Sequence, residues 1–116
     1  MASNRTEVQK EMRFKVLQLL SKNPQLSTRQ IAKEINVSNG SAFYCIHALI
    51  ETGLVKFDKF FKSKDKQNYA YILTKSGLAE KSDLTFSFLR KKRIEYEILK
   101  RELEELQDDV ELSFDD

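Results

Sequence analysis

The chain has 116 residues, of which 41% are hydrophobic and 33% are charged, and its formal net charge is +2. This length accommodates one domain with room for an appended element. No apolar run is long enough to span a bilayer and no signal-peptide-like segment follows Met1, so we expect no membrane association. The single cysteine, Cys45, excludes an intramolecular disulfide and a cysteine-rich zinc site, which is compatible with the cytosol.

Charge is distributed unevenly along the chain. Residues 1–76 contain 13 Lys and Arg against 6 Asp and Glu, whereas residues 77–116 contain 7 against 12. Such a division indicates one part that binds a polyanion and another part with a different task.

A core helix is predicted first. Thr6 or Asn4 is expected to cap it after a frayed start, and it should run to about Lys22. Asn23 and Pro24 end it, because the residue before proline avoids the helical region. Its apolar residues share one face: Val8, Met12, Val16, Leu19 and Leu20.

Two short helices with a tight turn between them are predicted next. Ser27 and Gln30 fit the capping-box pattern, in which each side chain bonds the other residue's backbone. Asn36 tolerates the left-handed conformation of a turn, Ser38 is a good N-cap, and Gly53 suits the end of the second helix. The apolar face of the first of these helices is Ile31, Ala32 and Ile35. This layout is a helix-turn-helix, whose second helix enters the DNA major groove.

The second helix has two distinct faces. Its buried stripe should comprise Ala42, Cys45 or Ile46, Leu49 and Ile50. The opposite face is polar and aromatic, without an acidic residue before Glu51: Asn39, Ser41, Phe43, Tyr44 and His47. A face of this kind on a small basic domain suits contact with a nucleic acid groove.

Several of these side chains also have simpler interpretations. Aromatic residues at helical spacing are more often core, but the buried stripe leaves Phe43 and Tyr44 outside, where Phe43 could meet a thymine methyl. His47 has no second histidine with which to bind a metal, which favours a groove or phosphate contact. Cys45 could be a thiol sensor, and the preferred alternative is a small buried hydrophobic residue. The polar residues at the helix start could contact DNA or only cap the helix: Ser38, Asn39 and Ser41.

A β-hairpin is predicted after Gly53. Residues 54–58 and 69–73 are rich in strand formers and bracket a lysine-rich loop, residues 59–68. Three helices followed by a hairpin are the order of a winged helix domain, with this loop as the wing. Lysine binds phosphate as a flexible point charge, so the wing should position the domain more than read sequence. Arg29 is suited to phosphate, although it could belong to a solvated face. The residues predicted to contact DNA are Arg29, Ser38, Asn39, Ser41, Phe43, Tyr44, His47, Lys62, Lys64 and Lys66.

The last part of the chain is predicted to be helical. A capped helical turn is expected at residues 74–81, and a long helix from about Leu84 to Gln107, followed by a frayed acidic tail. Heptad spacing relates Leu89, Tyr96, Leu103 and Val110, with Leu99 and Leu106 between them and Lys92 as a polar break. Because one such helix cannot bury its apolar stripe alone, we predict a homodimer held by Leu89, Tyr96, Leu99, Leu103 and Leu106.

The basic run at residues 90–93 has two interpretations. It could be a solvated helix surface, or it could pair with the acidic end of a partner helix, which would favour an antiparallel arrangement.

The predicted fold is therefore mainly α with a small β-hairpin: a winged helix-turn-helix followed by a long coiled-coil-like helix. Residues 6–81 would form the DNA-binding domain, 82–107 the dimerisation helix, and 108–116 an acidic tail.

The chain resembles the MarR (multiple antibiotic resistance regulator) family of winged helix proteins, and more narrowly the EPS-associated regulators. The likeness runs from about residue 10 to residue 105 and is carried chiefly by residues 14–17, 27–34, 44–50, 53–56, 63–66 and 69–77. The resemblance implies a bacterial, cytoplasmic transcription factor and links it to exopolysaccharide genes. The wing lacks the arginine that often enters the minor groove in this family, and Lys64 or Lys66 would have to substitute.

The leading hypothesis is thus a homodimeric regulator that binds double-stranded DNA and has no enzymatic activity. No Ser/His/Asp set, phosphate-binding glycine loop or metal cluster is evident, and the sequence assigns no cofactor, metal or small-molecule effector. The alternative is an adaptor that binds a partner protein through the aromatic face and does not bind DNA.

Overall fold

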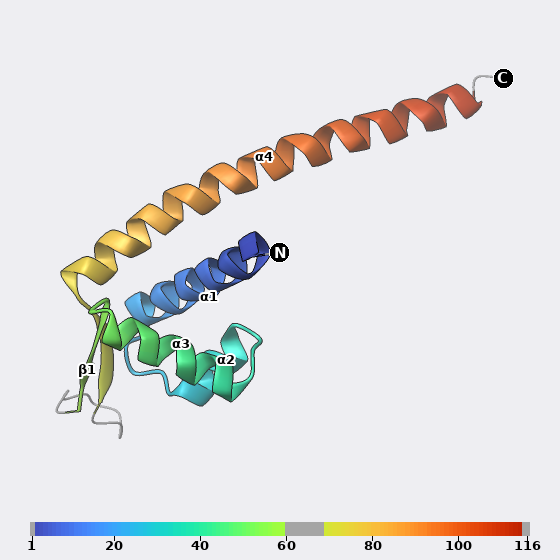
Figure 1. Cartoon of the computed structure of the whole chain (residues 1–116). Coiled ribbons are helices and arrows are strands. Elements are labelled where there is room, and N and C mark those ends of the chain that lie inside the picture. The colour runs from blue at the N-terminus through green and yellow to red at the C-terminus, as the bar shows by residue number, and fades with distance from the viewer. Residues whose placement is uncertain (1, 60–68, 115–116) are drawn as a thin grey trace. The chain divides into compact units, whose positions relative to one another are not determined.

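The computed structural model describes residues 2–59 and 69–114. Its elements are α1 (Ala2–Lys22), α2 (Thr28–Glu34), α3 (Asn39–Glu51), β1 (Val55–Asp58), β2 (Ala70–Leu73) and α4 (Lys75–Phe114) (Figure 1). This order confirms the predicted winged helix fold, mainly helical with one hairpin and a long C-terminal helix. The chain divides into two compact units, the first ending at Leu84 and the second beginning at Thr85.

Helix α1 is longer than predicted and buries a different set of residues. It begins at Ala2 rather than near Thr6. Val16, Leu17 and Leu20 are buried, whereas Val8 is 60% exposed. Among the α1 residues whose burial is described, the buried ones lie in the C-terminal half, and the helix contacts both β2 and α3. The predicted stripe therefore included Val8 and omitted Leu17. Helical spacing alone does not show over which part of a helix other elements pack.

The helix-turn-helix forms as its local signals predict. Ser27 Oγ accepts a hydrogen bond from the Gln30 backbone N–H at 3.1 Å, and Gln30 Oε1 accepts one from the Ser27 N–H at 2.8 Å. In the turn, Asn36 adopts a φ of 58°, and Gly53 adopts 77° after α3. The two helices pack through buried apolar residues: Ile31 and Ala32 of α2, with Ala42, Ile46 and Leu49 of α3. These short-range contacts orient α3.

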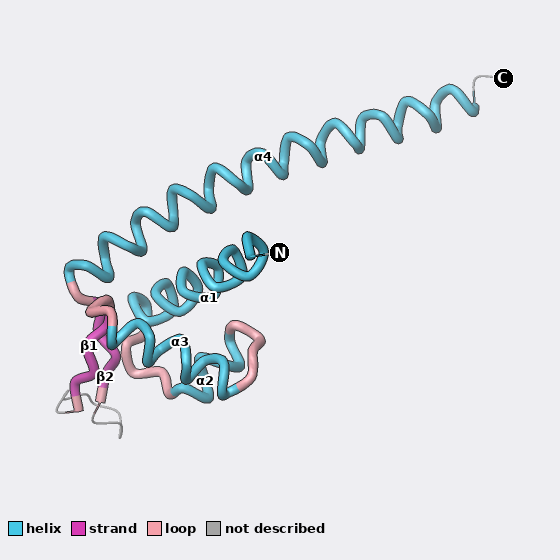
Figure 2. Tube along the Cα trace, viewed as in Figure 1, coloured by secondary structure: helices cyan, strands magenta, loops and turns pink. Residues whose placement is uncertain are grey.

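The hairpin pairs β1 and β2 antiparallel, with Phe57 opposite Tyr71 (Figure 2). The Tyr71 N–H donates to the Pro24 carbonyl at 2.7 Å, which ties β2 to the segment between α1 and α2. The rings of Phe57 and Tyr71 have centroids 5.2 Å apart, and the Tyr69 ring lies 5.9 Å from each of them. Cross-strand aromatic contacts of this kind stabilise the hairpin.

Helix α4 begins against the hairpin. Thr74 Oγ1 accepts a hydrogen bond from the Gly77 N–H at 3.1 Å and donates to the Gly53 carbonyl at 2.6 Å. An ion pair joins Arg13 Nε of α1 to Glu80 Oε1 at 3.4 Å. The first turns of α4 therefore belong to the winged helix unit.

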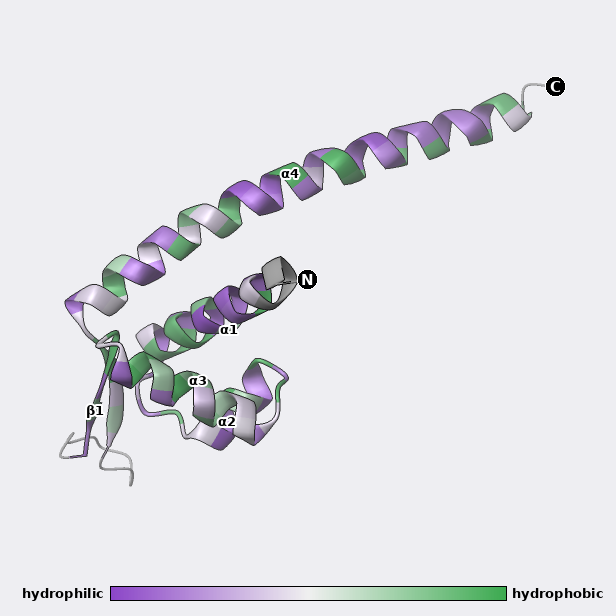
Figure 3. Ribbon diagram, in the orientation of Figure 1, coloured by the Kyte–Doolittle hydropathy of each residue, from purple (hydrophilic) through white to green (hydrophobic). Residues whose placement is uncertain are grey.

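The structure differs from the prediction in the length of α4. We expected a short helix ending near Lys81, a new one from about Leu84, and a frayed tail after Gln107, but one helix spans Lys75–Phe114. No Gly or Pro follows Gly77 to interrupt it. Hydrophobic and hydrophilic residues alternate along α4 (Figure 3). Within the described ranges, no helix is long and apolar enough to cross a membrane.

Candidate nucleic-acid interface

Helix α3 presents the predicted aromatic face to solvent. Tyr44 is 79% exposed and Phe43 is 52% exposed, while Ala42, Ile46 and Leu49 anchor the opposite side. Because successive helical residues differ by about 100° in direction, burying that stripe turns Tyr44 outward. The structure therefore confirms that both aromatic side chains are exposed, and their contact with DNA stays a prediction.

His47 is exposed and lies one turn after Phe43. The two rings have centroids 4.3 Å apart at an interplanar angle of 49°. This contact holds Phe43 and His47 together as one patch on α3. In the part of the chain that the structure describes, no group of three or more His, Cys, Asp or Glu residues could hold a metal ion.

The polar residues at the start of α3 form a local hydrogen-bond arrangement. Ser38 Oγ accepts from the Ser41 N–H at 3.1 Å and donates to Ser41 Oγ at 3.0 Å. Both residues and the neighbouring Asn39 are exposed. The capping role is thus present in the structure, and DNA contact by these three residues remains a prediction.

The predicted phosphate-binding cations lie in two places. Arg29 is exposed in the first turn of α2. Lys62, Lys64 and Lys66 of the wing lie outside the described residues. Lys56 on β1 is exposed. It is a further cation, near the predicted wing in sequence, that was not among the residues predicted to contact DNA, because it lies within a strand.

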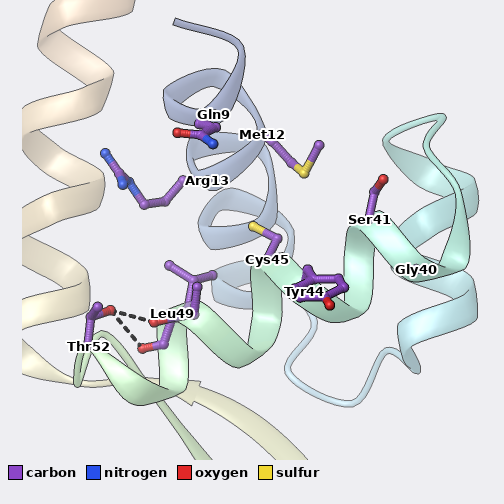
Figure 4. A pocket seen from close by; sticks show the side chains of 10 residues that line it. Gln9, Met12, Arg13, Gly40, Ser41, Tyr44, Cys45, Leu49 and Thr52 are labelled. Carbon is purple, nitrogen blue, oxygen red and sulfur yellow. Dashed lines mark hydrogen bonds between the residues drawn. The ribbon is translucent and has the colours of Figure 1, made fainter. Parts of the chain in front are cut away.

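A pocket of about 810 Å³ separates α1 from α3 (Figure 4). The sequence did not reveal this pocket, because its two walls lie some thirty residues apart in the chain. The lining residues are Gln9, Met12, Arg13, Gly40, Ser41, Tyr44, Cys45, Ala48, Leu49 and Thr52. Ser41 and Tyr44, predicted to contact DNA, thus also border the pocket.

Cys45 is half-buried on the wall of this pocket, with its side chain toward α1 (Figure 4). The prediction of a buried residue is therefore corrected to a half-buried one, because α1 and α3 leave space between them at this point. Burial raises the pKa of the Cys45 thiol, although the nearby Arg13 charge acts in the opposite direction. A raised pKa leaves less thiolate and makes the side chain less reactive, which does not favour a sensor role.

Arg13 is the charged residue of the pocket lining. Its Nε atom is buried without a hydrogen-bond acceptor among the described residues, and its ion pair with Glu80 is 3.4 Å long. Arg13 therefore links α1 to the start of α4 through this ion pair.

The predicted dimerisation residues are all exposed on the second unit. Their exposed fractions range from 45% for Leu89 to 62% for Tyr96, with Leu99, Leu103 and Leu106 between these values. A regular apolar stripe that remains exposed on a charged helix needs a partner surface. Pairing with a second copy stays a prediction.

Comparison with known proteins supports the fold and the nature of its first unit. Residues 9–56 match a family described as winged helix-turn-helix DNA-binding. Among solved structures, the adhesin competence repressor AdcR from Streptococcus pyogenes aligns with a TM-score of 0.64 and 20% identity, over 78% of this chain and 65% of that one. A MarR transcriptional regulator from Methanosarcina mazei Go1 aligns with a TM-score of 0.59 and 19% identity, over 74% of this chain and 60% of the Methanosarcina chain. ZitR from Lactococcus lactis aligns with a TM-score of 0.66 and 15% sequence identity, over 86% of this chain and 74% of the ZitR chain.

No protein of curated function matches the chain in sequence. The chain spans 65% of the AdcR chain and 60% of the Methanosarcina chain. At identities of 20% or below, the structural neighbours share the fold. Residues 9–56 thus resemble a winged helix-turn-helix DNA-binding family, and the chain shares its fold with solved MarR-type regulators.

Proposed function

We propose that this protein is a transcriptional regulator that binds specific double-stranded DNA as a homodimer in the bacterial cytoplasm. The observation that carries the proposal is α3, a helix fixed by its buried stripe and its N-cap, with Tyr44, Phe43 and His47 exposed on its outer side. The resemblance to EPS-associated regulators suggests exopolysaccharide genes as its targets.

Sequence would be read in the major groove by α3. The Tyr44 hydroxyl can donate or accept a hydrogen bond at a base edge, and the Phe43 ring can contact a thymine methyl. His47 can contact a base or a phosphate. Since base edges in this groove differ among the four base pairs, such contacts discriminate between sequences.

Affinity would come mainly from the cations. Arg29 and the wing residues Lys62, Lys64 and Lys66 are suited to phosphate, which positions the domain without reading sequence. Each phosphate neutralised releases counterions, so binding should weaken steeply as salt rises.

Two copies would place their α3 helices in successive major grooves, about 34–36 Å apart on a near-palindromic site. The exposed stripe on α4, including Leu99 and Leu103, would hold the copies together.

The decisive experiment is binding of the purified chain to random and candidate operator duplexes across a salt series. We expect affinity for both to fall as salt rises. We also expect Lys64→Ala combined with Lys66→Ala to weaken binding to all sequences similarly and to flatten the salt dependence. A chain that does not bind duplex DNA even at low salt would contradict the proposal, and an unchanged salt dependence in the double variant would remove the wing from it.

A second candidate function is that of a protein-binding adaptor. The exposure of Tyr44 and Phe43 favours it, because aromatic side chains are also common anchors of protein interfaces. Binding to a partner protein that persists at high salt, together with no affinity for DNA, would select this function.

A further inference from the structure

The exposed stripe of α4 has charged residues along both of its borders. In heptad letters, the apolar a positions are Leu89, Tyr96, Leu103 and Val110, and the d positions are Lys92, Leu99, Leu106 and Ser113. The bordering e positions are Arg93, Lys100 and Gln107, and the bordering g positions are Glu95, Glu102 and Asp109. All of these residues are exposed in the second unit. One border is therefore basic or neutral from Arg93 to Gln107, and the other is acidic from Glu95 to Asp109, with Phe88 and Phe114 at the outer ends of the two borders.

The relative direction of two paired helices decides which borders meet. In a parallel pair, each g residue faces the e residue of the next heptad on the other helix. Glu95 would then face the partner's Lys100, and Glu102 the partner's Gln107. The first contact pairs opposite charges and the second can form a hydrogen bond, and symmetry makes each of them occur twice.

An antiparallel pair brings like charges together. There g faces g and e faces e, whatever the register, so acidic residues such as Glu95 and Glu102 meet other acidic residues. On the other side Arg93 and Lys100 meet basic residues or Gln107. Like charges across an interface disfavour the pairing.

The basic run at residues 90–93 and the acidic end of α4 do not reverse this preference. Arg90 and Lys91 occupy b and c positions on the outer side of the helix, and Glu104, Glu105 and Asp108 occupy b, c and f. Charges on the outer sides of two paired helices are separated by more than one Debye length, about 10 Å at 0.1 M salt, and are largely screened. The residues next to the stripe therefore dominate.

Lys92 is the one charged residue within the stripe. Its Nζ atom lies 3.3 Å from Glu95 Oε2 of the same helix. The ammonium group is thus directed toward the acidic border rather than along the stripe, which reduces repulsion between two Lys92 side chains in a parallel pair.

We propose that two copies of this chain pair in parallel and in register through residues 89–110 of α4, with Glu95 of each copy facing the partner's Lys100. The inference rests on the homodimer of the proposed function and adds the relative direction of its two α4 helices. In such a pair the two Leu84 residues, at which the winged helix units end, stand at the same end of the paired helices.

A disulfide test distinguishes the two directions in the full-length chain. We would replace the native thiol by Cys45→Ser and introduce Ser113→Cys at the last d position, where the Ser113 hydroxyl is exposed and donates only to the Asp109 carbonyl. A disulfide needs Cα atoms about 4.4–6.8 Å apart. In a parallel pair the two residues at position 113 are adjacent. In an antiparallel pair with Leu99 against the partner's Leu103, they are roughly 36 Å apart at 1.5 Å per residue.

The matched control is Glu111→Cys in the same Cys45→Ser background. It lies in the same helical turn, is also exposed, and occupies an outer b position. We expect a covalent dimer in glutathione buffer with Ser113→Cys and little with Glu111→Cys, while both variants have the mass of a dimer under reducing conditions. A reduced dimer that does not cross-link through Ser113→Cys alone, but forms a disulfide between position 113 of one copy and position 89 of the other when Leu89→Cys is added, would overturn the parallel direction and leave the homodimer intact. Peptide mapping of the cross-linked dimer distinguishes this disulfide from one between the two positions 89, which a parallel pair would form. A monomer would overturn the pairing itself, and DNA binding measured on the same samples reports separately on the regulator.

A charge reversal provides a second measurement that does not depend on a thiol. Lys100→Glu places an acid opposite the partner's Glu95 and should raise the dimer dissociation constant roughly tenfold. Arg101→Glu changes the same charge at an outer f position and should have a much smaller effect. Adding Glu95→Lys to Lys100→Glu restores the opposite-charge contact and should recover the dimer. Equal effects of the two single variants, or no recovery, would contradict the parallel arrangement.

Discussion

Two neighbouring residues of α3 have different surroundings. Tyr44 is 79% exposed, whereas Cys45 is half-buried and faces the pocket beside α1. The 100° rotation between successive residues separates them once Ala42 and Ile46 are buried. Substitutions of single residues on α3 can therefore separate the proposed DNA-reading role of Tyr44 from the packing role of its neighbours.

Tyr44→Ala should reduce the ratio of specific to non-specific DNA affinity by about tenfold, because a good base contact contributes about 1–3 kcal/mol. Titration of operator and random duplexes measures the ratio. The stability of the fold should change by no more than about 0.5 kcal/mol, as expected of an exposed residue. Tyr44→Phe separates the hydroxyl from the ring, and Val8→Ala, 60% exposed on α1, serves as a control. An equal loss on both duplexes would contradict a reading role.

The Cys45 thiol should alkylate more slowly in the folded chain than in the unfolded chain. Burial raises its pKa above the ordinary value of 9.0, so less thiolate is present at neutral pH. The sign for stability follows from this direction: the contribution of the protonated thiol to folding is present below pH 9.0 and is lost as the pH rises above that value. Iodoacetamide rates between pH 7 and 10, with and without urea, test this. Equal folded and unfolded rates at pH 8 would show a reactive thiol instead.

At the scale of elements, the start of α4 is fixed by a close approach of backbone. A Cβ atom added at Gly77 would collide with the carbonyl oxygen of Leu54, and it would lie 3.4 Å from Leu73 Cβ. Only a residue without a side chain allows the helix to pass so near the segment before β1. Gly77 therefore determines where α4 meets the winged helix core.

Gly77→Ala should destabilise the fold by about 1–3 kcal/mol, because the backbone of Leu54 would have to move. Gly40→Ala is the matched control. The nearest atom to its added Cβ is Ser38 Oγ at 4.0 Å, and alanine favours a helix by up to about 1 kcal/mol over glycine. Urea unfolding of both variants at one protein concentration compares them. Similar midpoints for the two would mean that the contact at Gly77 is relieved at no cost.

At the scale of the whole molecule, the two compact units differ in how far their residues are buried. The first contains all of the residues that are fully buried in the described ranges, whereas the second is a helix whose residues are nearly all exposed. A change in the stripe of α4 should therefore alter assembly without unfolding the winged helix unit.

Leu103→Asp should shift the chain toward monomer and weaken binding to a two-half-site operator more than binding to a single half-site. Ile98→Asp is the control, because Ile98 is 50% exposed and Leu103 52% exposed on the same helix, but Ile98 lies off the stripe. Sedimentation measures assembly, and circular dichroism checks that the helices persist. Equal effects of the two variants would show that the stripe is not the interface.

Much of this protein follows from interactions between residues close in sequence. The caps at Ser27 and Ser38 and the turn at Asn36 depend on contacts within a few residues, so the sequence alone predicted the helix-turn-helix and the exposure of Tyr44. The hairpin followed likewise from two strand-forming segments around a polar loop. The heptad spacing and its charged borders are also properties of the sequence.

Other features depend on segments that are distant in the chain. The burial of Leu17 instead of Val8, the pocket beside Cys45 and the ion pair of Arg13 with Glu80 all arise where α1 meets later elements. The place where α4 begins against the core also depends on tertiary structure, because Gly77 lies against the backbone of Leu54. Helical periodicity specifies the direction of a side chain, but the tertiary structure decides which element, if any, covers it, because burial requires a partner surface.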